Sequence, residues 1–354
     1  MKASKLAAGA LALIVPSAFC LTGCSFGVFN TFNYRYDDAD KYEAGDREID
    51  DTIKKLNIDY LSGDVKVKGT DEDTVSVRET TNKSVDDDHK VHTWVDGNTL
   101  YVRYCASMDM ISFNGIEKSL EITLPGDQEL DDFIIDVSSG TIDLNGFTTD
   151  KLNAHASSGD TTIDCSAKDI EVKSSSGSIS LTQTGSSDSV TVKASSGDIV
   201  IYQKGDCASL DVDSSSGKTN ITSNGTLDYV KLHSSSGGIN ATFGTVNTLK
   251  VEVSSGPIVI DADEVKDLYT KASSGHSDIT LDKAPETSNI ECSSGGIDVS
   301  IPEDSDLTIH TNISSGEFNS DLPFAKDGKN YTIGNGTYEM NIRCSSGDVS
   351  VHSI

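Results

Sequence analysis

The tripeptide Ser-Ser-Gly recurs eleven times, and this repeat constrains the fold of the 354-residue chain more than any other feature. Successive repeats lie 18–21 residues apart, except for the last, which follows after 31 residues. A fixed period near 20 residues with turn residues in phase is typical of a solenoid, in which each repeat forms one rung. The glycines of the repeat are Gly140, Gly159, Gly177, Gly197, Gly217, Gly237, Gly256, Gly275, Gly295, Gly316 and Gly347.

Apolar residues keep a fixed phase relative to each of these glycines. Large apolar side chains stand seven positions before ten of the eleven, the exception being Ser288. Apolar or small side chains also recur five and three positions before the glycine, and two and four positions after it. Because strand side chains alternate between two faces, these sets point inward and the polar residues between them point outward. Each rung is therefore predicted to be a strand, a corner, a second strand and a variable return loop.

Glycine at each corner is explained by backbone geometry. A sharp bend that needs a positive φ favours glycine, since a Cβ would clash there. The eleven repeat glycines are therefore predicted to be structural turn residues. Gly225, in Ser223-Asn224-Gly225-Thr226, falls in a return loop instead and is expected to tolerate substitution.

The two ends of the repeat region depart from the period. The long final interval contains Asp327-Gly328-Lys329 and Gly334-Asn335-Gly336, which are typical of hairpin turns. We expect residues 323–340 to form an inserted hairpin that covers one side of the last rungs. The chain is then predicted to return to the last rung, which it would leave open at Ile354.

Before the repeats, residues 49–126 are β-rich without the full motif, and they alternate around Ser62-Gly63. They are predicted to form an N-terminal β section that caps the solenoid of residues 127–354. Residues 24–48 show no clear period and are expected to be a tether.

The start of the chain predicts its compartment. Lys2 and Lys5 precede an apolar stretch that is too short to span a membrane, which is the layout of a secretory signal over residues 1–23. The stretch ends in Leu21-Thr22-Gly23-Cys24, which resembles the lipobox of bacterial lipoproteins. The resemblance implies lipid attachment at Cys24 and a location on the cell membrane, facing the extracytoplasmic side. The alternative is an ordinary signal peptide that contains a cysteine.

Charge limits the partners of the chain. The formal net charge is −28, and loss of residues 1–23 with Lys2 and Lys5 would make it about −30. Such a surface repels nucleic acid and anionic lipid head groups, so no nucleic-acid partner is expected.

Cysteine usage does not suggest a disulfide framework. Five cysteines remain beyond Cys24, and an odd number outside the cytoplasm does not indicate designed pairing. Cys165, Cys292 and Cys344 occupy inward phases of the repeat, whereas Cys105 and Cys207 lie outside these phases. In chain order Cys292 and Cys344 would be two rungs apart, near 10 Å, which exceeds the reach of a disulfide.

The repeated serines allow two interpretations. The twenty-two motif hydroxyls could form a ligand surface that contacts sugar hydroxyls. Serine also satisfies backbone groups at tight corners, and this second interpretation is favoured.

No catalytic, cofactor or metal site is predicted. His89 and His92 lie near Asp86-Asp87-Asp88, but a solvated charged loop explains this cluster better than a metal site. Polysaccharide-acting enzymes with β-helical folds need clustered carboxylates or a base beside a metal-bound acid. Here Asp211 and Asp213 would share an outward face with lysines of neighbouring rungs.

Several segments together resemble a known family. They are Leu61-Ser62-Gly63-Asp64-Val65, Trp94-Val95-Asp96-Gly97-Asn98-Thr99-Leu100 and Lys118-Ser119-Leu120-Glu121-Ile122-Thr123-Leu124-Pro125, followed by the repeated Ser-Ser-Gly-x-Ile. Over residues 50–354 the chain resembles the DUF4097 adhesin family. The resemblance implies an all-β parallel β-helix, usually right-handed, in bacterial surface and membrane-linked proteins, with no established catalytic residues.

These observations predict a non-enzymatic, lipid-anchored cell-surface adhesin or binding scaffold. Its partner would be a cell-wall glycan, a host glycan or a membrane protein. The alternative is an envelope-stress or signalling accessory that binds a partner protein, and a polysaccharide-acting enzyme or end-to-end assembly is less favoured. No cofactor is expected.

Overall fold

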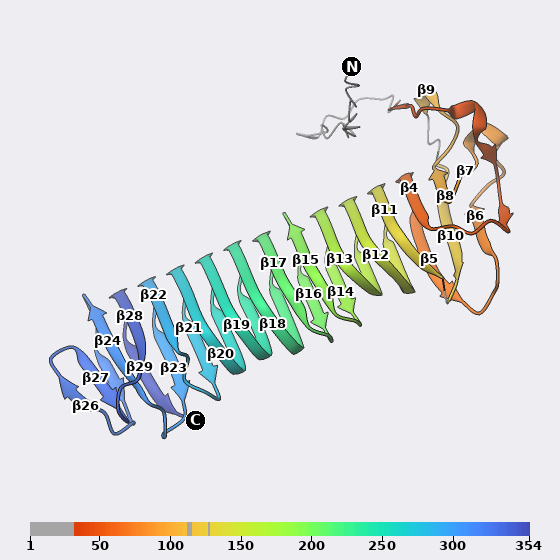
Figure 1. Ribbon diagram of the computed structural model, residues 1–354. Coiled ribbons are helices and arrows are strands. Elements are labelled where there is room, and N and C mark those ends of the chain that lie inside the picture. The colour runs from red at the N-terminus through yellow and green to blue at the C-terminus, as the bar shows by residue number, and fades with distance from the viewer. Residues whose placement is uncertain (1–31, 112–114, 127) are drawn as a thin grey trace, which may run out of the picture.

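The protein is a long solenoid of parallel β-strands. The computed structural model describes residues 32–111, 115–126 and 128–354, and Figure 1 shows a straight row of rungs between an N-terminal cap and a C-terminal hairpin. The predicted signal and Cys24 lie outside the described residues. Within these residues the helices are two short 3-10 turns, η1 (Ala39–Lys41) and η2 (Asp87–His89), and none is long and apolar enough to cross a membrane.

The central rungs follow one path from corner to corner. Five strands cover this path without interruption: β12 (Ile142–Ser158), β13 (Thr161–Ser176), β18 (Thr219–Ser236), β19 (Ile239–Ser255) and β20 (Ile258–Ser274). In each of the other rungs the same path is formed by two shorter strands. These pairs are β14 (Ile179–Gln183) with β15 (Ser187–Ala194), β16 (Ile199–Gln203) with β17 (Cys207–Ser216), β21 (Ser277–Leu281) with β22 (Thr287–Ser294), and β23 (Ile297–Ile301) with β24 (Leu307–Ile313). The return segments are thus mostly strand, not the variable loops that the repeat pattern predicted.

Neighbouring rungs pair in parallel and in register, which stacks equivalent residues into columns. Val212, for example, pairs with Val192 on one side and with Leu232 on the other. Val212 is fully buried while Asp213 beside it is exposed, as the inward and outward phases predicted. Asp211 pairs with Lys231 of the next rung, and their side chains form an ion pair at 3.4 Å on the outward face.

Two further inward columns extend the core beyond the five phases identified in the sequence, which predicted only Cys165 of their members to point inward. One lies six positions after the corner glycine and includes Cys165, Gln183, Gln203, Ser223 and Phe243, all buried. The other lies ten positions before it in the central rungs and includes Ala167, Ser187, Cys207, Leu227 and Val246. The second column gives Cys207 a core position, which the sequence alone did not provide.

The corner glycines stack directly on one another. All eleven have φ between +110° and +150°. A Cβ on Gly217 would lie 2.1 Å from the carbonyl oxygen of Gly197, and the same contact recurs at each of the other corners. The backbone of one rung therefore occupies the space that a side chain on the next rung would need.

Gly225 does not lie in a tolerant loop. It stacks on Gly205 at a second corner, where a Cβ would lie 2.3 Å from the carbonyl oxygen of Gly205. The expectation that this position accepts substitution is therefore wrong, because the return path is itself a stacked column.

The N-terminal section begins the stack and closes its edge. Its elements are β1 (Phe32–Tyr34), β2 (Glu43–Ala44), β3 (Arg47–Ile49), β4 (Lys55–Ser62), β5 (Asp64–Thr70), β6 (Val75–Thr81), β7 (His92–Asp96), β8 (Thr99–Arg103), β9 (Met108–Ile111) and β10 (Lys118–Pro125). Strands β4 and β5 form a rung around Gly63 and pair with β11 (Glu129–Ser139) and β12. Strands β8 and β10 lie beyond them in parallel pairing, and the antiparallel strands β7 and β6 then cover β8 and β10. Strands β2 and β3 pair in turn with β7 and β6, so this part of residues 24–48 belongs to the cap and is not the tether that the sequence predicted.

The C-terminal rungs do not stack in chain order. Their strands are β25 (Phe318–Ser320), β26 (Ala325–Asp327), β27 (Asn330–Ile333), β28 (Tyr338–Ser346) and β29 (Val349–Ser353). Strand β28 pairs with β22 on one side and with β24 on the other, and β29 lies likewise between β23 and β25 (Figure 1). The rung of Gly347 is thus inserted between those of Gly295 and Gly316.

This order corrects the expected ending. The chain finishes on the penultimate rung, and the rung of Gly316 is terminal. The predicted hairpin is present as β26 and β27, which are joined at Gly328 and Lys329 and cover β24 in antiparallel pairing. The second predicted turn, at Gly334–Gly336, is not a hairpin turn, because β27 and β28 lie on opposite sides of β24.

Candidate binding surface along the serine ladders

The motif serines form two continuous rows along the corners. The second serine of one motif pairs in register with that of the next, as in Ser216, Ser236 and Ser255. All twenty-two serines are exposed except Ser157, which is half-buried. We call these two rows the serine ladders. Rungs in parallel pairing repeat about every 4.8 Å, so the hydroxyls recur at that interval.

Side chains outside the Ser-Ser-Gly motif form the hydrogen bonds to the backbone at the corners. The residue before the motif donates to the corner carbonyl, as Ser174 Oγ does to Gly177 O at 3.3 Å and Ser234 Oγ to Gly237 O at 3.1 Å. The aspartate after the glycine accepts an N–H from the next rung, as Asp198 Oδ1 does from Lys218 N at 2.7 Å.

The motif hydroxyls themselves are left for solvent or a ligand. Within the described parts of the chain, no side-chain hydrogen bond joins them to another protein group. They therefore do not have the backbone-satisfying role that the sequence interpretation favoured. An exposed hydroxyl can both donate and accept, so the ladders offer a regular set of polar contacts.

A hollow of about 300 Å³ lies beside the ladders near the middle of the solenoid. We call it the serine hollow. Its lining combines ladder hydroxyls with charged side chains of the outward row: His155, Lys173, Ser174, Ser175, Lys193, Ala194, Ser195, Asp213 and Ser215. Two lysines from adjacent rungs, Lys173 and Lys193, are register partners here. Lys173 also forms an ion pair with Glu171 at 2.6 Å, and Asp213 is the register partner of Lys193, so the hollow places charges of both signs next to the hydroxyls.

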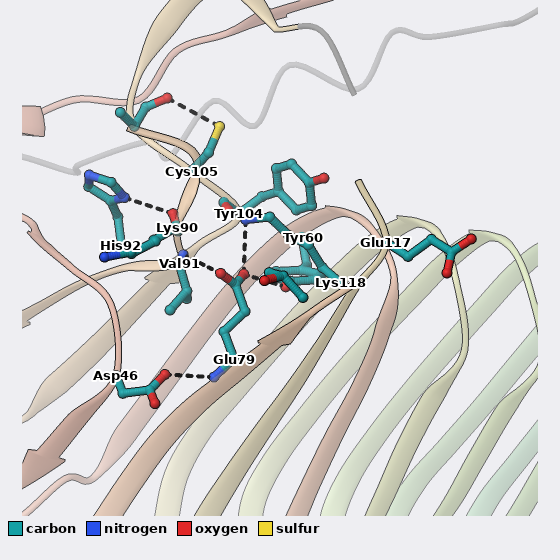
Figure 2. A network of polar contacts seen from close by, with 12 residues as sticks. Asp46, Tyr60, Glu79, Lys90, Val91, His92, Tyr104, Cys105, Glu117 and Lys118 are labelled. Atoms are coloured by element: carbon teal, nitrogen blue, oxygen red, sulfur yellow. Dashed lines mark hydrogen bonds and ion pairs between the residues drawn. The ribbon is translucent and has the colours of Figure 1, made fainter. Parts of the chain in front are cut away.

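A second polar feature is buried in the N-terminal cap. Lys118 Nζ lies 2.9 Å from Glu79 Oε1, and the two side chains are only 1% and 4% exposed. Lys118 also donates to Tyr104 O at 2.7 Å, while Glu79 accepts from Tyr60 Oη at 2.8 Å and Val91 N at 2.9 Å. Figure 2 shows these groups converging on the Glu79 carboxylate. The network joins β4, β6 and β10 to the segment before β7.

Burial governs the titration of this network. It lowers the pKa of Lys118, although the carboxylate of Glu79 opposes the shift, and it raises the pKa of Tyr60 well above its usual range. Burial also raises the pKa of the nearby Cys105 thiol to about 12. The network is closed and its groups bond to one another, so we interpret it as a structural connection of the cap.

The acidic loop at Asp86-Asp87-Asp88, which raised the possibility of a metal site, contains ion pairs between residues close in sequence. His89 pairs with Asp86 and Asp87 pairs with Lys90, while the His92 ring lies against the Lys90 carbonyl oxygen at 2.9 Å. Across the described residues, no group of three or more His, Cys, Asp or Glu side chains has an arrangement that could hold a metal ion.

The family of the chain follows from its sequence. The model of the Toastrack DUF4097 family matches residues 53–187 and again residues 184–352. The chain belongs to the Toastrack DUF4097 family. The two matches overlap at residues 184–187 within the solenoid and together cover this Toastrack chain from residue 53 to residue 352. No curated protein matches it.

Several solved structures are similar to this Toastrack protein at low identity. One is described as "a putative cell adhesion protein" from Clostridium sporogenes, with 11% identity, a TM-score of 0.19 and coverage of 88% of this chain and 100% of that one. A "putative lipid binding protein" from Parabacteroides distasonis has 14% identity, a TM-score of 0.27 and coverage of 88% and 97%. A "putative adhesin" from Bacteroides fragilis has 14% identity, a TM-score of 0.24 and coverage of 87% and 96%.

Proposed function

We propose that this Toastrack protein is a non-enzymatic, lipid-anchored scaffold on the extracytoplasmic face of the cell membrane, where its serine ladders bind a glycan. The observation that carries the proposal is the set of exposed hydroxyls that recur in register and make no side-chain hydrogen bond within the described protein. A polymer of sugars presents hydroxyls at regular intervals and can exchange hydrogen bonds with such a row.

The serine hollow favours glycans that carry acidic groups. Lys173 and Lys193 lie beside Ser175, Ser195 and Ser215 in its lining. Lys173 already pairs with Glu171 at 2.6 Å, so a carboxylate or phosphate on the glycan would pair with Lys193, while neutral hydroxyls contact the serines. The long acidic remainder of the chain would repel other polyanions such as nucleic acid.

The proposal is tested with an array of cell-wall and host glycans, probed with the secreted chain in which Cys24→Ala prevents lipid attachment. We expect binding to acidic glycans and a loss of at least about tenfold in affinity for the triple variant Ser175→Ala, Ser195→Ala, Ser215→Ala. Outward hydroxyls outside the ladders provide the matched control, since the triple variant Thr182→Ala, Thr222→Ala, Thr242→Ala should bind normally. An array without binding, combined with a membrane protein that co-purifies with the chain, would support the signalling alternative instead.

Lipid anchoring is tested by localisation. We expect the wild-type chain in the membrane fraction and the Cys24→Ala variant in the soluble fraction, because two or three acyl chains hold a protein on a membrane firmly. Fractionation followed by immunoblotting measures this distribution. Membrane retention of the variant equal to that of the wild type would contradict the anchoring at Cys24.

A further inference from the structure

The crossing of the C-terminal rungs brings two cysteines together. Cys292 on β22 and Cys344 on β28 are direct register partners in neighbouring rungs. The sequence placed them two rungs apart and beyond the reach of a disulfide. That prediction is wrong, because β28 inserts next to β22 rather than after β24.

The two thiols share one neighbour inside the core. Their residues are only 3% and 1% exposed, and each sulfur lies 3.5 Å from the same atom, the carbonyl oxygen of Gly295. In-register parallel strands hold paired Cα atoms about 4.8 Å apart, which falls within the ~4.4–6.8 Å that disulfides span. The Cβ atoms of such partners lie about as far apart as the Cα atoms, slightly beyond the ~3.5–4.5 Å of a disulfide, so bonding requires a small approach of the two strands as well as rotation of the side chains.

This arrangement distinguishes the pair from the other repeat cysteines. Cys165 pairs with Phe147 and Gln183, and Cys207 pairs with Ser187 and Leu227, so neither faces another thiol in the neighbouring rungs. The cysteine pair instead lies where the rung order departs from the chain order. A covalent bond at this point would hold β28 in its inserted position.

We propose that Cys292 and Cys344 form a disulfide that joins the inserted C-terminal rung to its neighbour. The oxidant is a disulfide, either of low molecular weight or in a thiol oxidoreductase of the envelope. One cysteine thiolate attacks the oxidant, which gives a mixed disulfide and releases one thiolate. The second cysteine thiolate then attacks the bound cysteine sulfur and releases the other. Two thiols are oxidised, one disulfide is reduced, and the two protons pass to the released thiolates.

The bond forms before the rung is fully docked. In the folded protein Cys292 and Cys344 are only 3% and 1% exposed, so an oxidant cannot reach their sulfurs, and burial also raises the pKa of both thiols. Once formed, the disulfide closes a loop that contains β23 to β27, including the capping hairpin. Such a loop restricts the unfolded chain and so stabilises the folded C-terminal end.

The test uses the full chain, refolded from denaturant in a buffer of oxidised and reduced glutathione. Free thiols are then alkylated in denaturant, and the peptides are mapped by mass spectrometry before reduction. We expect one cross-linked species that joins the peptides of Cys292 and Cys344, while Cys105, Cys165 and Cys207 are alkylated. Full alkylation of Cys292 and Cys344 after oxidative refolding would overturn the proposal.

A double variant distinguishes the stabilisation by the disulfide from the stabilisation by packing of the two side chains. The double variant Cys292→Ser, Cys344→Ser should fold, because serine occupies the equivalent position in the rungs of Ser174 and Ser214. Dithiothreitol should lower the Tm of the oxidised wild type by roughly 5 °C and leave the double variant unchanged. The control Cys165→Ser should keep the sensitivity to reductant. A reductant effect of equal size in the double variant would also refute the disulfide.

Discussion

Replacement of Gly217 by alanine is expected to lower the free energy of unfolding by about 4 kcal/mol, which is exceptional for the addition of one methyl group. The added Cβ would lie 2.1 Å from Gly197 O and 2.6 Å from Gly197 C, and both atoms belong to backbone that cannot rotate away. The φ of +110° adds backbone strain for any residue with a side chain. The neighbouring rung would have to shift to make room.

Gly244 offers a matched control within the same solenoid. A Cβ there would meet its nearest atom, Asn224 O, at an ordinary contact distance of 3.5 Å, and its φ lies outside the left-handed region. Gly244→Ala should therefore change the stability by no more than about 0.5 kcal/mol.

Hydrogen exchange on both variants measures the extent of the damage. Loss of protection in Gly217→Ala should concentrate in the rungs of Gly197, Gly217 and Gly237, because each rung contacts only its neighbours. Equal loss of protection in Gly217→Ala and Gly244→Ala would mean that stacked carbonyl groups are not what requires glycine at the corners.

Lys118→Met should destabilise the N-terminal cap by about 3–5 kcal/mol. The substitution leaves the Glu79 carboxylate buried with Tyr60 Oη and Val91 N as partners but without its cation. It also removes the donor to Tyr104 O. A buried charge that loses its partner carries its desolvation cost uncompensated, whereas methionine fills a similar volume.

The double variant Lys118→Met, Glu79→Leu separates the charge from the packing. Removal of both ions should recover much of the lost stability, since a buried ion pair is often replaceable by apolar residues. Trp94, the single tryptophan of the chain, lies on β7 of the cap and reports its unfolding by fluorescence. If Lys118→Met and the double variant unfolded at the same denaturant concentration as the wild type, the ion pair would not be holding the cap together.

Much of the solenoid could be predicted because its signal is local and repeated. The period-two alternation around Gly217 identifies Leu210, Val212 and Ile221 as inward residues, and all three are buried. The sequence pattern does not predict the column that contains Gln183 and Gln203, because a polar residue such as glutamine is expected to point outward. Inside the core, Gln183 Nε2 donates to Ala167 O at 2.6 Å and its Oε1 accepts from Ala167 N at 3.1 Å, which replaces the missing backbone partners of the return corner.

Two other features do have a signal in the sequence. Gly185, Gly205 and Gly225 recur every 20 residues, which already indicated a second stacked corner. Lys118 continues the alternation of Leu120 and Ile122, so its position indicated burial of a charge.

The order of the last rungs could not be read from the sequence. Every rung presents nearly the same backbone edge to its neighbour. On the sequence alone, β28 could therefore pair with β22, or it could pair with the far edge of β24. The inserted position gives β28 a partner on both sides. The hairpin of β26 and β27 then covers the edge that remains on β24. Exposed strand edges invite unwanted pairing, and this arrangement protects the end of the stack.

The continuity of the stack through this crossover underlies the glycine columns, the serine ladders and the cysteine pair. The order of the rungs is tested most directly by measuring distances between two nitroxide labels with electron spin resonance. The labels are placed on exposed ladder positions, with Ser215→Cys combined with either Ser345→Cys or Ser314→Cys. Ser345 is five rungs from Ser215 and Ser314 is six, so we expect separations of about 24 Å and about 29 Å respectively. The reverse order, with Ser314 nearer to Ser215 than Ser345 is, would contradict the inserted rung.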